Sequence, residues 1–176
     1  LGTRFYVENP FYPLTQTVAD INMDGANQFG RTSDMETIGF GASTLDDVGL
    51  AVAKAQGRDM HPDSHPERGG YYRSDHFEFA KAGVPSYYPK SGKLYLGQPD
   101  DYGEKIVNDY IAHDYHQVSD EVKPGWTFEG AAQDTEFLAE VGLRVANGDQ
   151  WPEWKPGNEF KARRDALLAA AKKAKP

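Results

Sequence analysis

The chain has 176 residues, of which 39% are hydrophobic and 12% aromatic, enough for the core of one ordinary domain and too many for a disordered acidic tail. The formal net charge of −8 argues against a nucleic-acid-binding module, whose affinity would depend on contacts with phosphates. No apolar run approaches the length of a membrane span, and the lack of cysteine excludes disulfides, thiolate nucleophiles and cysteine-ligated zinc.

The first third of the chain predicts short strands followed by a helix. Residues 18–23 form an apolar stretch that ends at an Asp24-Gly25 turn signal, and residues 35–40 form a second alternating stretch. Apolar residues at helical spacing then predict a helix over 43–57.

The middle of the chain predicts a long loop and then a helix joined to a strand. Residues 58–73 show no periodicity, and long ordered loops often carry function. Ser74 is typical of a helix N-cap, so we expect a helix from there to residue 82, ended by Gly83 and followed by a strand over 84–88. This order favours a layered α/β architecture.

The last third predicts helices over 101–112, 127–147 and 160–173, with a polar loop over 113–121. The helix over 127–147 has the clearest pattern, because its apolar residues share one face over several turns.

The charge divides the chain into two parts. Residues 158–176 hold six basic and two acidic residues, so the rest of the chain is strongly acidic. We expect a domain body over 1–157 and a basic amphipathic helix within 158–176 that packs on the body or extends from it.

A metal site in this chain would need histidine and carboxylate ligands. Asp24 follows a predicted buried strand, where α/β sheets tend to place ligands, although on the pattern alone a turn with Gly25 is the better explanation. His116 lies in the polar loop and could be a ligand, a base or a solvated surface residue.

Three adjacent residues, Ser74, Asp75 and His76, have the side chains of a catalytic triad. Neighbours at a helix start cannot align as nucleophile, base and orienting group, so helix capping is the better interpretation. His61 and His65 are four residues apart, but the prolines beside them exclude the helix that would align them on a metal.

Three segments in order resemble the co-catalytic zinc metallopeptidase family, which includes bacterial leucyl aminopeptidases and glutamate carboxypeptidases. They are Asn-Met-Asp-Gly at 22–25, the run from Tyr72 to Pro85 with its Ser-Asp-His, and Tyr-His-Gln-Val-Ser-Asp-Glu at 115–121. The resemblance covers nearly the whole chain and corresponds to the C-terminal half of the family's peptidase domain.

The resemblance implies a fold and a reaction. The fold is an α/β class with a mixed, mostly parallel sheet and helices on both faces. The reaction is peptide-bond hydrolysis by a water that two zinc ions activate, in an exopeptidase of the aminopeptidase type with a peptide substrate. By resemblance, Asp24 and His116 are zinc ligands and Tyr115 donates to the substrate carbonyl, while Arg73, Ser74 and Asp75 line the substrate site.

The family's remaining site residues are not found. No Glu-Glu pair occurs in the chain, and no His-x-Asp segment precedes Asn22. The chain begins at Leu1 without methionine, so we expect it to be part of a longer protein. We therefore expect the chain alone to be inactive and the intact parent to be an enzyme, its site completed by the missing N-terminal half or by another chain.

Three alternatives stay open. The same fold includes glutaminyl cyclases with a single zinc and catalytically silent binding modules. A module that binds carbohydrate or a partner protein through Trp126, Trp151 and Trp154 is the third. Members of the zinc peptidase family are usually exported, so the resemblance implies a periplasmic or secreted protein.

Overall fold

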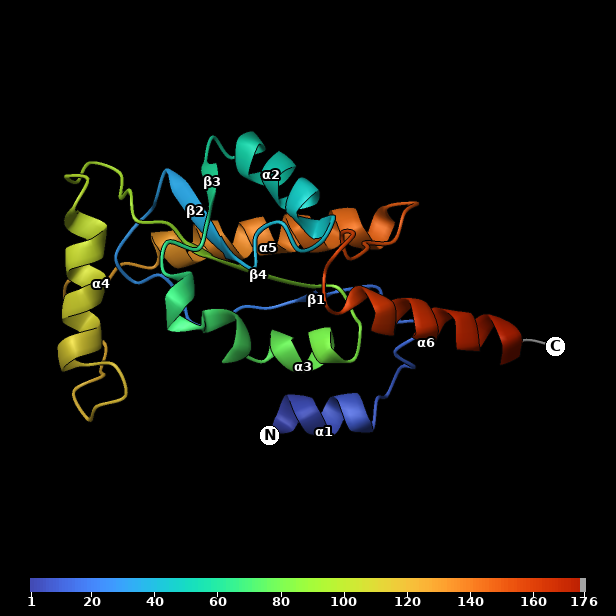
Figure 1. The fold of residues 1–176 in the computed structure, drawn as a ribbon. Helices are drawn as coiled ribbons and strands as arrows, with labels where there is room; N and C mark the ends of the chain where they lie inside the picture. Colours follow the sequence, from blue (N-terminus) through green and yellow to red (C-terminus); the bar gives the residue numbers. More distant parts are fainter. Residues whose placement is uncertain (175–176) are drawn as a thin grey trace.

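The computed structural model describes residues 1–174 and centres on a mixed sheet of four strands, in the order β1-β4-β2-β3 (Figure 1). The strands are β1 (Asp20–Ile21), β2 (Asp34–Ile38), β3 (Asp59–Pro62) and β4 (Ser86–Ser91). β1 pairs with β4 and β2 with β3 in parallel, whereas β2 and β4 are antiparallel. The expected α/β fold with a mixed, mostly parallel sheet is confirmed.

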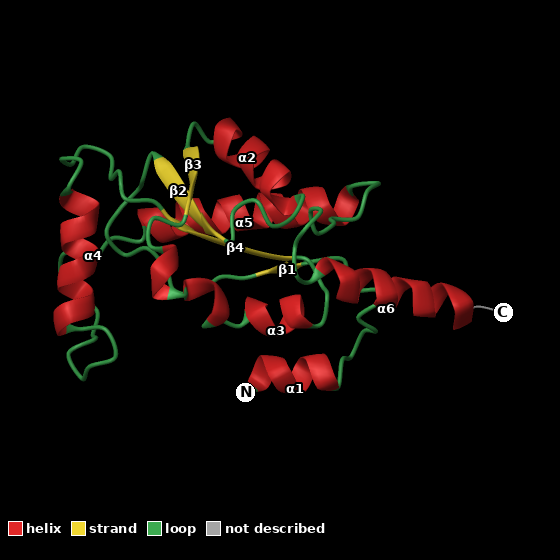
Figure 2. Cartoon of the chain, in the orientation of Figure 1, coloured by secondary structure: helices red, strands yellow, loops and turns green. Residues whose placement is uncertain are grey.

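Helices cover both faces of this sheet (Figures 1 and 2). On one face lie α2 (Leu45–Ala55) and α5 (Glu129–Asn147), which contact each other. On the other face, α1 (Gly2–Glu8) packs on α3 (His76–Lys81), and α3 contacts β1 and β4. The two-sided cover explains why β4 is buried over four consecutive residues rather than at alternate positions.

Two more helices lie toward opposite ends of the molecule in Figure 1: α4 (Tyr102–His113) and α6 (Lys161–Ala174). None of the helices among residues 1–174 is long and apolar enough to cross a membrane.

The segment that we expected to be one long loop, 58–73, contains the strand β3 and two short 3₁₀ helices. The 3₁₀ helices are Pro66–Arg68 and Gly70–Tyr72. The loop prediction is wrong for β3 because this strand lies at the sheet edge with mostly exposed side chains and ends in a proline, so it lacks the pattern of a buried strand.

The main core lies between the sheet and the α2–α5 face. It consists of the buried residues Met35, Leu45, Val52, Ala53, Tyr87, Phe137 and Val141. A smaller core on the other side consists of Ala80, Trp154 and Phe160. The Trp154 indole N–H donates to the Gly83 carbonyl at 2.8 Å, which satisfies the polar atom of this buried ring.

The C-terminal helix begins on this smaller core. Arg164 is buried and donates to the carbonyl oxygens of Leu14 and Thr17, both at 2.9 Å. The helix bounds agree with the predicted 160–173 to within one residue. The division of the chain at residue 157 stays a prediction, and the last two residues of the predicted segment 158–176 lie outside the described part.

Candidate active-site cleft

A cleft of about 570 Å³ opens at the end of the sheet where β1 and β4 finish. The loop after β1, the last residues of β4 and the helices α4 and α5 supply most of its lining. Its apolar wall includes Phe29, Tyr95, Val107, Ile111 and Leu138. The lining also includes charged and polar side chains, and apolar surface combined with polar groups is the usual form of a small-molecule or peptide site.

Asp24 is one of the charged residues that line the cleft. It lies in the loop directly after β1, and Gly25 allows the turn because its φ is +87°. The Asp24 Oδ2 atom accepts two hydrogen bonds, from Ser74 Oγ at 3.2 Å and from the Tyr88 hydroxyl at 3.1 Å. Within the described residues Oδ1 accepts none, so this oxygen is free to contact a ligand.

The two donors are themselves held in place. Asn22 Nδ2 donates to Ser74 Oγ at 3.0 Å, which turns the Ser74 hydroxyl proton toward Asp24. Tyr88 is buried on β4, and burial raises the pKa of its phenol, as does the nearby negative charge of Asp24. The phenol therefore stays protonated and acts as a donor to the carboxylate.

Ser74 does not cap the following helix, as its sequence position predicted. Asp75 is the N-cap residue of α3, and neither its side chain nor that of Ser74 bonds to the helix start. The hydroxyl of Ser74 is engaged by Asp24 across fifty residues of sequence. The capping interpretation is therefore wrong for this side chain. Ser74 is not part of the cleft lining, so its role in substrate binding stays a prediction.

His76 is fully buried. Its ring lies 4.8 Å from the Tyr71 ring and 4.9 Å from the Tyr88 ring, centre to centre. Burial lowers the pKa of His76 to about 4, although Asp24 and Asp75 act in the opposite direction. Its imidazole is therefore neutral at physiological pH and packs as an aromatic ring behind Tyr88.

Tyr115 and His116 follow α4. Tyr115 lines the cleft, and its ring stacks on that of His116 with 3.8 Å between the ring centres. His116 is exposed, and its φ of +60° is the only positive value at a non-glycine residue among those described. Such a conformation is uncommon and often marks a functional position. The structure shows no contact between His116 and Asp24 within residues 1–174.

Arg73 and Asp75 make hydrogen bonds outside the set of residues that were expected to form the site with them. The Arg73 guanidinium donates to the Arg68 carbonyl oxygen at 3.4 Å, and Asp75 Oδ1 accepts from Thr3 Oγ1 of α1 at 2.7 Å. Neither residue is part of the cleft lining, so their role in substrate binding stays a prediction.

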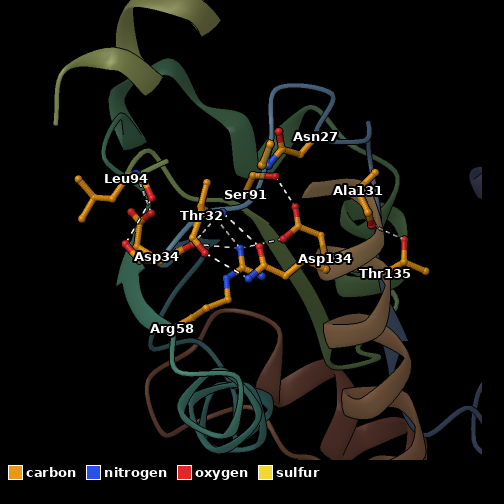
Figure 3. Close-up of polar contacts among 12 residues, drawn as sticks. Asn27, Thr32, Asp34, Arg58, Ser91, Leu94, Ala131, Asp134 and Thr135 are labelled. Carbon is orange, nitrogen blue, oxygen red and sulfur yellow. Dashed lines mark hydrogen bonds and ion pairs between the residues drawn. The ribbon is translucent and has the colours of Figure 1, made fainter. Parts of the chain in front are cut away.

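A buried ion pair supports the far wall of the cleft (Figure 3). Arg58 Nη2 lies 2.8 Å from Asp134 Oδ1 of α5 and donates to Thr32 Oγ1 at 2.7 Å. Ser91, at the end of β4, donates to the other Asp134 oxygen. Sequence reasoning missed this network because its members are far apart in the chain and form no motif.

Comparison with known proteins identifies the family. Residues 1–137 match the model of peptidase family M28. The matched segment is more than three quarters of the chain and includes Asp24, Tyr115 and His116. The chain belongs to peptidase family M28. No curated protein and no solved structure gives a significant match.

Membership of family M28 makes the parent a zinc-dependent metallopeptidase, as the resemblance implied. Asp24 is suited to hold a zinc ion, because its carboxylate is oriented and keeps one oxygen free. Within residues 1–174, however, no three histidine or carboxylate side chains are grouped closely enough to bind a metal. Since catalytic zinc normally has three protein ligands, the described residues do not form a complete zinc site by themselves.

Proposed function

We propose that this chain supplies one wall of the active site of a zinc-dependent exopeptidase of the aminopeptidase type, exported to the periplasm or the medium. Asp24 and His116 would be zinc ligands, and Tyr115 would donate to the substrate carbonyl. The observation that carries the proposal is the Asp24 carboxylate, held at the cleft by two hydroxyl donors in a chain of family M28. When bound, two zinc ions would supply Lewis-acid activation of water and of the scissile carbonyl.

The chain's own residues would prepare the carboxylate for this task. Tyr88 and Ser74 both occupy Oδ2, so Asp24 would present Oδ1 and act as a ligand through that oxygen alone. Partners that hydrogen-bond a metal ligand fix its orientation, and their loss usually weakens metal binding. The apolar wall of the cleft would hold the peptide and limit the access of water.

We further propose that the described residues alone do not hydrolyse peptides. They offer no group of three histidine or carboxylate side chains, whereas the reaction needs metal ligands and a carboxylate that accepts a proton from the attacking water. The remaining groups would come from a further segment of the parent protein or from another chain.

Zinc titration calorimetry and an assay with leucine p-nitroanilide test the proposal on this chain. We expect weak zinc binding that Asp24→Asn and His116→Gln each reduce, and no hydrolysis at saturating zinc. His113→Gln is the matched control, because His113 is an exposed histidine on α4 paired with Asp109. Zinc binding that neither substitution changes would exclude these residues as ligands. Hydrolysis by the chain alone would contradict the proposed incompleteness of the site.

A further inference from the structure

Lys90 brings a positive charge to the cleft lining. It lies on β4 two residues after Tyr88, is exposed and lines the cleft. In the part of the chain that the structure describes, its ammonium group has neither a hydrogen-bond acceptor nor an ion-pair partner. Lys93, a second cleft cation, is already engaged, because its ammonium donates to Ser64 Oγ at 2.7 Å and lies 3.9 Å from Glu36.

The ammonium group of Lys90 lies beside the ring of Tyr88, whose hydroxyl donates to Asp24. It lies 5.9 Å from the centre of the Tyr88 ring, and the hydroxyl of the same ring lies 3.1 Å from Asp24 Oδ2. One tyrosine ring therefore separates the cation from the carboxylate. Neighbouring residues of an extended peptide are about 3.5 Å apart, so a side chain or chain end one or two residues beyond a peptide group at Asp24 can extend past the Tyr88 ring toward Lys90.

Glu36 does not neutralise Lys90 in this arrangement. The two residues are opposite each other in the β2–β4 pair, yet the carboxylate of Glu36 lies within ion-pair distance of Lys93 and not of Lys90. An ammonium group with three donors and no acceptor is suited to bind a carboxylate.

We propose that Lys90 forms a subsite for a substrate carboxylate, either an acidic side chain or the free C-terminus of a short peptide. This inference rests on the proposed peptidase function, because it takes the peptide group to lie at Asp24. The negative net charge of the chain disfavours anionic ligands in general, so a preference for them must come from a local cation.

Three dipeptides separate the two sources of the carboxylate. Ala-Gln carries only the C-terminal carboxylate, Ala-Glu-amide carries only the acidic side chain, and Ala-Gln-amide carries neither. Each is titrated into the isotope-labelled chain, and the dissociation constant is read from the chemical shifts of cleft residues. We expect one or both of the anionic peptides to bind about tenfold more tightly than Ala-Gln-amide, because a charged hydrogen bond in a cleft is stronger than a neutral one.

Lys90→Met removes the cation and keeps most of the side-chain volume, so it should abolish the preference. Lys81→Met is the matched control: Lys81 also lies over an aromatic ring, 4.9 Å from the centre of Phe77, but outside the cleft, and its loss changes the net charge equally. A preference that survives Lys90→Met, an equal loss in Lys81→Met, or no binding of any peptide would overturn the subsite. The preference could depend on Lys90 while zinc binding is unchanged by Asp24→Asn and His116→Gln. That result would contradict the proposed function but not the subsite.

Discussion

At the scale of single residues, burial selects the protonation state of the groups around the cleft. Tyr88 stays a phenol and His76 a neutral imidazole because both are buried. Asp24 differs, since it is exposed and receives two hydroxyl donors. Asp24 is thus an oriented carboxylate whose two donors are neutral, which suits a ligand that must bind a cation.

Asp20 shows what burial costs a carboxylate that keeps one oxygen without a donor. One of its oxygens is buried without a partner, and burial raises the pKa of Asp20 to about 6. The folded state therefore favours the neutral acid, and stability is lost as the pH rises from about 4 through 6. Asp20→Asn should raise the free energy of unfolding by about 2 kcal/mol at pH 8 and leave it unchanged below pH 4.

Urea denaturation at both pH values measures this difference. Asp75→Asn serves as the control, because Asp75 is an exposed carboxylate whose nearby charge contributes to the raised pKa of Asp20. It should have a much smaller effect at pH 8. Equal stabilisation by Asp20→Asn at pH 8 and at pH 4 would show that the buried charge is not the cause.

Tyr88→Phe tests the support of Asp24. The substitution keeps the buried ring and removes one donor to Oδ2, so we expect the protein to fold and to lose about 1 kcal/mol of stability. Ser74→Ala should cost a similar amount, and the double variant should deviate from additivity because both hydroxyls bind the same oxygen. A double-mutant cycle by urea denaturation measures the coupling, and strict additivity would contradict it.

At the scale of elements, sequence patterns predict the long helices and the buried strands β2 and β4 well, and the short strands β1 and β3 poorly. The helix predicted over 127–147 is observed at Glu129–Asn147, because its apolar face repeats over several turns. The strand predicted over 18–23 pairs only at Asp20 and Ile21, and β3 was missed entirely. Strand extent depends on what a neighbouring strand offers, and that information is not local.

The candidate site shows the same limit. The position of Asp24 could be predicted because it directly follows an apolar stretch that predicts a strand, and α/β sheets tend to place ligands where such strands end. The contribution of Tyr88 could not, because a tyrosine inside a buried strand looks like a core residue until the loop after β1 is placed beside it. The positive φ of His116 likewise has no sequence signal, since histidine adopts this conformation only occasionally.

The join between α3 and α6 depends on Gly83 and Arg164. A Cβ atom at Gly83 would lie 2.7 Å from the Arg164 backbone nitrogen, so only glycine permits this approach, and its φ is +94°. The Arg164 side chain then binds two carbonyl oxygens near the N-terminus.

Arg164→Met should therefore destabilise the protein by about 3 kcal/mol, because it leaves two carbonyl oxygens without their charged donor. Arg163→Met is the matched control, since Arg163 is the exposed neighbour on the same helix and should cost little. Thermal unfolding and hydrogen exchange of residues 13–17 measure the effect. Equal losses in the two variants would contradict a specific role for Arg164.

At the scale of the whole molecule, one buried ion pair connects the sheet to the helix that forms a wall of the cleft. Arg58 follows α2 and precedes β3, whereas Asp134 lies on α5 beside the cleft. The network is completed by Thr32 just before β2, by Asp34 on β2 and by Ser91 at the end of β4 (Figure 3). These contacts join α5, which lines the cleft, to the sheet. The position of α5 therefore depends on a pair of buried charges.

Removing one member of this pair should cost more than removing both. Arg58→Met alone leaves the Asp134 carboxylate mostly buried without its cation, and Asp134→Leu leaves the guanidinium uncompensated, so each should lose about 3–5 kcal/mol. The double variant Arg58→Met/Asp134→Leu buries two apolar groups instead, and its loss should be smaller than either single loss. Urea denaturation of the four proteins measures the coupling. A double variant that loses the sum of the two single losses would show that hydrogen bonding by each residue separately, rather than charge compensation, holds α5 against the sheet.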